Sequence, residues 1–580
     1  MKKIGKEKDV KPELINSLIK KMKVDSVCLP SFQREFVWKP KQMAMLVESI
    51  IRHYPIGTLL FLPYLENTDL GKNSFNNREA YAFQPKYYVI DGQQRLRTFL
   101  YTMNVPSSFR PHDSLEGDSK KYKIYLNITV NPNKLPIDID KPTFVVPWAT
   151  EEEDRENYKL QGEEKLMPIE YILSEKYIKK WFTKAFDKKA KIHKKYINNI
   201  FEVRKRILSY KCPVEYVIRK LNPQDHTNIF RLLNEAGTDL TAFDLLSARV
   251  NSYHINLREM WKHSFKKYDV FKQYDLDPIY LLKVLLLIRQ TKNGSDNPTC
   301  VKKDLKDVQK KYNIDPEPGR KAENSFKKEF KEDWEHACLY TAKALINLRW
   351  DFGACQKKYI PYTPMIVTLA AILWWIDVYK GYDEKYKAGF KEIIKHWYWG
   401  SIFARAYDKH SDTIVSDHYF SLREYIQIGK RKKIPSDIKF WLSKGEIRES
   451  IGDIDSSGDA RYKAILCMPL INGAEDIYSH EYLADSILHD HHIYPKKCVD
   501  VKNIEESDLN IILNRMLITD KTNGEIKKQS PYDYLDKKCC KNLDKHFLWK
   551  GIYKNKLSYR KFVANRKERL ADYLYSLINT

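Results

Sequence analysis

The sequence predicts an α+β protein of three domains, at residues 1–253, 254–428 and 429–580. Between Val27 and Val130, short apolar runs alternate with amphipathic segments, which is typical of a domain that mixes helices and strands. From His254 to Tyr425, long segments have helical periodicity and few strand signals, so we expect a helical middle domain. The length of 580 residues also favours several domains, because single hydrophobic cores stop growing near about 250–300 residues.

The N-terminal domain is expected to be an α/β domain with closely spaced elements. Pro40 is expected to begin a helix, because proline is favoured in the first turn and apolar residues follow it at helical spacing. Strands are expected at 58–62 and 86–91, and the second strand ends in an acidic residue before a glycine. Residues 92–103 have the pattern of a helix, so the order is strand, tight turn, helix. A strand at 214–218 is expected to rejoin this domain.

The net charge suits a polyanionic partner but does not identify one. The chain has 101 Lys and Arg residues against 76 Asp and Glu residues, which gives a formal net charge of +25. Nucleic acid is the obvious partner for such a surface. A lysine-rich composition whose side chains form solvated faces explains the excess equally well, so charge alone decides nothing.

The sequence favours a cytoplasmic protein without a membrane segment. The basic N-terminus lacks the apolar stretch of a signal peptide. The most apolar stretches, 279–288 and 365–376, are shorter than the roughly 18–20 residues that cross a bilayer, so we expect buried helices there. The 9 cysteines show neither CxxC pairs nor a secreted framework, which fits free thiols in a reducing compartment.

A histidine-rich run near the C-terminus, HDHHIYP at 489–495, has the features of a phosphodiester-cleaving metal site. Such hydrolysis needs an activated water, a cation beside the phosphate and a fixed geometry between them. In a ββα-metal arrangement, His491 would ligate Mg²⁺ or Mn²⁺ and His492 would act as the general base. Asn523, on a following helix, would be the second metal ligand. Asn514 would brace the loop that orients the base.

Simpler interpretations of this run remain open. A cluster of histidines also arises as a surface accident or as an adventitious zinc site, and asparagine is common near turns. Two features strengthen the catalytic interpretation, namely the downstream pair Asn514 and Asn523, with a short apolar strand between them, and the basic aromatic tail from Lys537 to Lys567. Ser530 and Pro531 have the pattern of a helix start.

A second constellation lies in the N-terminal domain. An Asp at a strand end, a Gly that permits close approach and a helix N-terminus could form a phosphate cradle, which arginines would neutralise. The same pattern fits an ordinary helix cap with Gln and Arg side chains paired on its surface, and the residues alone favour that simpler interpretation. No GxxxxGK[ST] motif is present, so a P-loop is not expected. The nucleotide-binding candidates are Gln33, Arg34, Asp91, Gly92, Gln93, Gln94 and Arg95.

The C-terminal segments resemble a known nuclease family. KAILCMPLINGAED at 463–476, HHIYP at 491–495 and PYDY at 531–534, with Asn514 and Asn523, are similar to the HNH nuclease half of GmrSD-type restriction systems. The segment YRKFVANR at 559–566 fits the end of that domain. The HHIYP run has Tyr where many relatives carry Phe.

The N-terminal motifs carry a matching resemblance. FQREFVW at 32–38 and DGQQR at 91–95 resemble the ParB/sulfiredoxin-like domain at the front of GmrSD proteins and of SspE, the phosphorothioate-sensing nuclease. Segments 230–244 and 397–405 look like further motifs of that family, whereas most of 255–362 is unmatched. The resemblance implies that GTP or another NTP binds, and is hydrolysed, at the DGQQR motif. It also implies that the front half senses modified DNA or gates the nuclease.

We therefore expect a nucleotide-regulated, metal-dependent endonuclease that nicks or cuts double-stranded, modified DNA in antiphage defence, in the manner of type IV restriction. One alternative is a DNA-modification sensor without catalysis, in which the histidines hold a structural zinc. Another is an abortive-infection DNase that destroys host DNA. Homo-oligomerisation is compatible with the sequence, which leaves the oligomeric state open.

Overall fold

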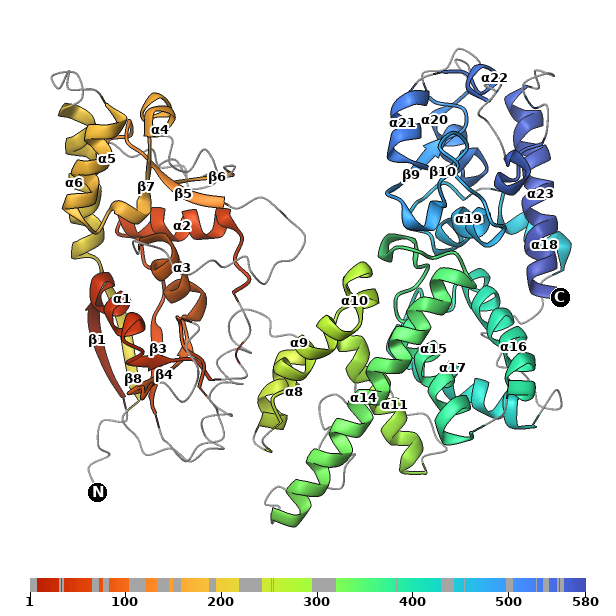
Figure 1. Ribbon diagram of the computed structural model, residues 1–580, viewed down its shortest axis with the longest axis horizontal. Helices are drawn as coiled ribbons and strands as arrows, with labels where there is room; N and C mark the ends of the chain where they lie inside the picture. The colour runs from red at the N-terminus through yellow and green to blue at the C-terminus, as the bar shows by residue number, and fades with distance from the viewer. Residues whose placement is uncertain are drawn as a thin grey trace. The chain divides into compact units, whose positions relative to one another are not determined.

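The computed structural model groups the chain into two compact units, Met1–Arg258 and Glu259–Thr580 (Figure 1). Helices combined with small sheets confirm the α+β class. The boundary expected near residue 429 remains a prediction. The structure describes residues 8–30, 33, 36–64, 72–76, 83–103, 122–133, 145–149, 158–186, 194–217, 242–251, 253, 255–294, 320–381, 384–428, 443–452, 454–496, 504–527, 529–535, 542–549, 552 and 558–579.

A mixed five-stranded sheet forms the centre of the first unit. Its order is β1-β8-β3-β4-β2, in which β1/β8 and β3/β4 are antiparallel and β8/β3 and β4/β2 are parallel. The late strand β8 inserts between two early strands, so the expected return of a strand near residue 214 to this domain is confirmed. The strands are β1 (Lys8–Leu14), β2 (Val27–Cys28), β3 (Leu59–Pro63), β4 (Tyr87–Asp91) and β8 (Lys211–Val217).

The turn between β4 and α3 (Gln93–Met103) depends on Gly92. This residue has φ +98°, and a Cβ added to it would lie 2.2 Å from Leu59 Cδ2 on β3. Both the backbone conformation and the lack of space therefore favour glycine. The expected order of strand, tight turn and helix is confirmed, and the helix expected from Pro40 is α2 (Pro40–Ile51).

Helices and a second, smaller sheet complete the first unit. The three-stranded antiparallel sheet has the order β6-β5-β7. One continuous apolar core includes Val47 of α2, Phe99 of α3, Leu126 of β5 and Val214 of β8. The remaining elements are α1 (Ile15–Lys23), β5 (Tyr122–Asn127), β6 (Val145–Ala149), α4 (Tyr158–Glu164), β7 (Leu166–Pro168), η4 (Ile169–Tyr171), α5 (Glu175–Ala185), α6 (Lys194–Ser209) and α8 (Ala242–Asn251).

The second unit begins with helices that pack on one another. The two most apolar stretches form α11 and α15 and are almost completely buried, as expected. None of the described helices combines the length and apolar character needed to cross a membrane. The elements are α9 (Leu257–Lys267), α10 (Asp269–Gln273), α11 (Ile279–Lys292), α14 (Arg320–Trp350), η5 (Lys357–Tyr359), α15 (Met365–Trp374), η6 (Trp375–Tyr379), α16 (Glu384–Phe403) and α17 (Ser411–Ile428).

The C-terminal part of the second unit contains a two-stranded antiparallel sheet followed by a helix. Strands β9 and β10 pair over their full length, and α21 starts directly after β10. Ser530 caps α22 and Pro531 is its first residue, as the sequence predicts. The elements are α18 (Lys444–Ser450), α19 (Ala460–Ile471), η7 (Leu483–Asp485), β9 (Leu488–His492), α20 (Glu506–Asn510), η9 (Ile512–Asn514), β10 (Arg515–Thr519), α21 (Asp520–Ile526), α22 (Pro531–Tyr534), η10 (Leu543–His546) and α23 (Tyr559–Asn579).

The segment after α14 holds the start of β9. Lys358 Nζ donates to the Leu488 carbonyl at 2.9 Å, and the Tyr359 hydroxyl donates to the same oxygen at 3.3 Å. Gly353 packs against α19 so closely that a Cβ would lie 2.5 Å from the Cys467 carbonyl oxygen. The helical part and the C-terminal part of this unit are therefore tightly packed where Gly353 meets α19.

We expect Gly353→Ala to destabilise the second unit by about 2–4 kcal/mol. A left-handed residue costs about 1 kcal/mol when it is not glycine, and overpacking adds about 1–3 kcal/mol. Gly473→Ala is the control, since Gly473 also has positive φ, +74°, but no atom within 4 Å of the added Cβ. Denaturant unfolding measures both variants, and equal losses of stability would contradict the tight interface.

Candidate active site

The β9/β10 pairing places two adjacent histidines at the end of a strand. His491 lies opposite Met516 and His492 lies opposite Arg515. The side chain of His491 is buried, whereas that of His492 is partly exposed. Because successive strand residues point to opposite faces, the two imidazoles have different neighbours.

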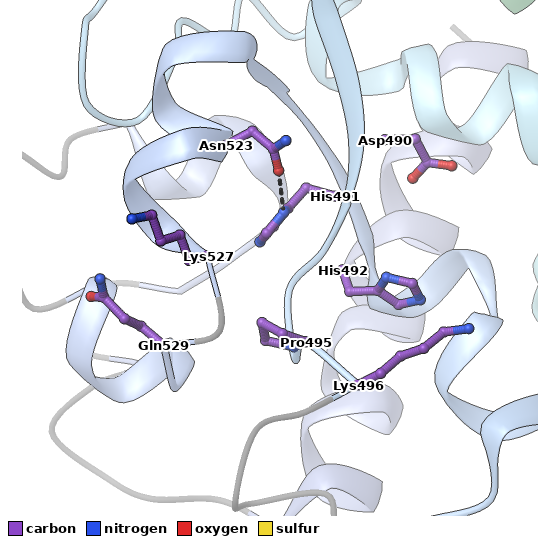
Figure 2. Close-up of a pocket in the computed structure, with 8 residues that line it drawn as sticks. All are labelled: Asp490, His491, His492, Pro495, Lys496, Asn523, Lys527 and Gln529. Atoms are coloured by element: carbon purple, nitrogen blue, oxygen red, sulfur yellow. Dashed lines mark hydrogen bonds between the residues drawn. The ribbon is translucent and has the colours of Figure 1, made fainter.

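His491 contacts the helix that follows β10. Its Nδ1 donates a hydrogen bond to Asn523 Oδ1 on α21 at 3.0 Å (Figure 2), since an amide oxygen can only accept. A shared Mg²⁺ or Mn²⁺ would replace this proton, because two ligands at right angles on an octahedral ion, each about 2.1 Å from it, also lie about 3 Å apart. The other ring nitrogen, Nε2, is buried and has no hydrogen-bond partner among the described residues. These residues therefore fit a metal ion.

His492 is oriented by a residue that the sequence did not single out. Its Nε2 lies 3.2 Å from Asn510 Oδ1, and Arg515 Nη2 donates to the same oxygen at 3.3 Å. Arginine can only donate, so the shared Asn510 atom is the acceptor and His492 Nε2 carries the proton. In the neutral ring, Nδ1 is then the nitrogen that can accept one.

The environment keeps both imidazoles neutral. Burial lowers the pKa of His491 to about 4. Burial also lowers the pKa of His492 to about 4, and the positive charge of Arg515 adds to that effect. Near neutral pH each ring therefore has one unprotonated nitrogen, which metal ligation and general-base catalysis both require.

Asn514 acts on the loop after His492 rather than on the reacting groups. Its side chain is fully buried, accepts a hydrogen bond from the Tyr494 N–H at 2.8 Å and donates to the Leu509 carbonyl at 2.9 Å. Its own carbonyl accepts from the Ile493 N–H at 2.8 Å. These contacts are compatible with the bracing role expected from the sequence, and that role of Asn514 stays a prediction.

Two further buried groups hold the site together. Asp476 accepts hydrogen bonds from the Thr519 N–H at 2.8 Å and from the Thr522 hydroxyl, which fixes the start of α21. Burial by itself would raise the pKa of Asp476, but the hydrogen bonds to its carboxylate outweigh burial, so the pKa lies below its ordinary value. Arg566 on α23 donates to the Leu513 carbonyl at 2.8 Å, directly before Asn514. Both lie in the quoted motifs, but their spacing did not indicate these roles.

A cavity of about 920 Å³ opens beside the two histidines. Its lining combines neutral imidazoles, amides, two lysines and one carboxylate, that of Asp490, and this polar, mainly basic lining suits a polyanionic backbone rather than an apolar ligand (Figure 2). His489 does not line it and pairs with Asp520 instead. The lining residues are Asp490, His491, His492, Pro495, Lys496, Asn523, Lys527 and Gln529.

In the described part of the chain, no three His, Cys, Asp or Glu side chains gather to hold a metal ion. An ion at His491 and Asn523 would therefore take its other ligands from water and substrate. Such sparse protein ligation is usual for Mg²⁺, which retains several waters and binds substrate phosphate.

The two N-terminal motifs lie against each other in the first unit. Gln33 is buried, and its Nε2 donates to the carbonyls of Val89 at 2.7 Å and Ile90 at 3.0 Å. Gln94 Oε1 accepts from the Val37 N–H at 3.0 Å. Gln33 and Val37 therefore lie against the end of β4 and the start of α3. Arg34 lies outside the described residues.

The guanidinium of Arg95 is already engaged within the protein. It donates to the carbonyls of Ile56 at 2.7 Å and Thr58 at 3.1 Å, and it pairs with Asp91 at 2.8 Å. Asp91 remains half exposed at the strand end, with its side chain 53% accessible. Gln93 and Gln94 are largely buried. The expected binding of a nucleotide at this turn stays a prediction.

Comparison with known proteins assigns the first unit. Residues 15–251 match the model of the GmrSD restriction endonuclease, N-terminal domain. An uncharacterized protein of Methanocaldococcus jannaschii, MJ0686, is 27% identical over 540 residues, which cover 89% of this chain and 85% of that protein. The similarity to that protein thus extends beyond the N-terminal domain. Residues 15–251 are therefore an N-terminal domain of the GmrSD restriction endonuclease type, which supports a GmrSD-type assignment of the chain.

Proposed function

We propose that the second unit is an HNH-type, metal-dependent DNA endonuclease whose active site is the cavity beside His491 and His492. The observation that carries the proposal is the convergence of two neutral imidazoles and Asn523 on one cavity. A GmrSD-type protein has DNA as its expected substrate, and the formal net charge of +25 is compatible with that polyanion.

The chemistry follows from the positions of these side chains. His492 has its Nε2–H directed to Asn510, so its Nδ1 would take a proton from the attacking water. His491 and Asn523 would hold Mg²⁺ or Mn²⁺. The bound ion would supply positive charge to the phosphate and the leaving oxygen. Asn514 would position the loop after His492, Asp476 the start of α21 and Arg566 the backbone directly before Asn514.

The proposed biological role is antiphage defence against modified DNA, regulated by a nucleotide at the first unit. A single active site of this size would cut one strand per encounter, so nicking is the expected elementary step. Two alternatives remain, a modification sensor with a structural zinc and an abortive-infection DNase. Stoichiometric zinc without cleavage in any divalent cation would favour the sensor, and His492-dependent toxicity would favour the DNase.

We expect His492→Ala to lower DNA cleavage in Mg²⁺ by at least about 100-fold, because general-base catalysis contributes about 10²–10⁴-fold. His489→Ala is the matched control: this histidine belongs to the same strand, pairs with Asp520 and does not line the cavity. The assay is nicking of plain and modified plasmids by the purified full chain, with circular dichroism as the check on folding. Undiminished nicking by His492→Ala would rule out the proposed base.

Asn510→Leu is expected to lower cleavage by about 10- to 100-fold without changing metal affinity. Leucine has a similar size but removes the oxygen that selects the tautomer of His492. Asn510→Asp restores an acceptor and is expected to recover most of the rate. Cleavage rates measured across Mg²⁺ concentrations separate the effects, and equal rates for the Leu and wild-type proteins would argue against orientation by Asn510.

We also propose that a nucleotide binds at the turn between β4 and α3. Gln33 Oε1 supports this, because it is buried and has no hydrogen-bond partner among the described residues. Gly92 lets the chain turn where a Cβ would meet Leu59, and Asp91 is accessible at the same turn. GTP is the first candidate, and the other NTPs are the comparison.

Asp91→Asn is expected to weaken GTP binding or turnover by at least about 10-fold while the unfolding midpoint stays nearly constant, since exposed ion pairs contribute at most about 1 kcal/mol. Glu202→Gln, which breaks another i,i+4 carboxylate–arginine pair in the first unit, is the control. Arg95 is less suitable for this test because its loss would also free two backbone carbonyls. Unchanged GTP turnover in Asp91→Asn would exclude the site.

A further inference from the structure

Lys527 adopts a backbone conformation that a lysine rarely takes. It follows the last residue of α21 with φ 52° and ψ −110°. These values are close to those of the first central residue of a type II′ turn, a position dominated by glycine because a Cβ is strained there. Strained non-glycine residues concentrate at functional sites, where the side chain itself is needed.

The position of the Lys527 side chain indicates a function for it in the cavity. Lys527 lines the same cavity as His491 and Asn523 (Figure 2). Its backbone N–H donates to the Asn523 carbonyl at 3.3 Å, so the backbones of the lysine and the proposed metal ligand are joined through the last turn of one helix. A substrate group near Asn523 would therefore be within the reach of a flexible lysine.

The charge of Lys527 is not used elsewhere in the described part of the chain. The other lysine of the cavity, Lys496, pairs with Glu506. No such carboxylate, and no other hydrogen-bonding partner, is found for the ammonium of Lys527 among the described residues. The one carboxylate of the described lining, Asp490, accepts a hydrogen bond from Tyr462 and lies 3.6 Å from Arg515, so it is engaged away from Lys527.

We propose that Lys527 binds a backbone phosphate of the DNA substrate next to the bond that is cut. The inference rests on the proposed nuclease function and deepens it by assigning the contact that seats the substrate. An ammonium is a point charge that can follow the phosphate as the reaction proceeds. Glycine would relieve the backbone strain at this position but could not provide the charge, which explains a lysine there.

Lys527→Gly tests the proposal because it should preserve or raise the stability of the protein while it lowers DNA cleavage and DNA binding. Relief of backbone strain offsets the greater flexibility of glycine in the unfolded chain, so the unfolding midpoint should stay within about 2 °C of the wild type or rise. Cleavage should fall by at least about 10-fold. The slope of the logarithm of the DNA-binding constant against the logarithm of salt concentration should become shallower by about 0.9, which is the contribution of one phosphate contact. Lys527→Ala should match these DNA effects although it keeps a Cβ at the strained position, and Lys527→Arg should retain binding.

Lys521→Ala is the matched control, since it removes an exposed lysine from the same helix outside the cavity. DNA binding is measured on a His492→Ala background, so that cleavage does not interfere. Undiminished cleavage by His492→Ala would contradict the proposed active site on which this inference rests. If His492→Ala is inactive but Lys527→Gly cuts and binds like the wild type, only the assignment of Lys527 fails.

Discussion

The antiparallel pairing of β9 with β10, from Leu488 opposite Thr519 to His492 opposite Arg515, is the constraint on which the C-terminal site depends. It sets the distance between the histidines on one strand and α21, which starts where the other strand ends. The start of β9 is held by the segment after α14, and its end is held by the amide of Asn514. Small movements of either strand would separate His491 from Asn523.

Buried polar groups do most of the positioning around this hairpin. Asn514, Asp476 and Arg566 are each nearly inaccessible and direct their hydrogen bonds mainly to backbone groups of neighbouring segments. Losing one partner of such a bond leaves a desolvated polar group, which costs about 1–3 kcal/mol and more when the group is charged. The groups that face the cavity, in contrast, are sparsely bonded. Rigidly held residues behind side chains that make few hydrogen bonds suit a site in which an ion and a phosphate supply the remaining contacts.

The first unit follows the opposite pattern at its motif. Gln33, Gln94 and Arg95 direct their hydrogen bonds to backbone groups of the strand–turn–helix unit, and Gly92 provides the space that this turn requires. The motif therefore has a structural role that is visible without any ligand. Its accessible parts are Asp91 and the polar surroundings of Gln33, which is where a nucleotide would have to bind.

Local patterns in the sequence alone determined the α+β class, the helix from Pro40, the strand–turn–helix around Gly92 and the strand between Asn514 and Asn523, because periodicity, proline and glycine act over a few residues. The motif resemblance further identified the type of the N-terminal domain. Only the tertiary structure brought Asn510 to His492, Arg566 to Leu513 and Lys527 to the cavity wall. These contacts depend on how β9, α21 and α23 pack, and side-chain partners between separate segments leave no periodic signal in the chain.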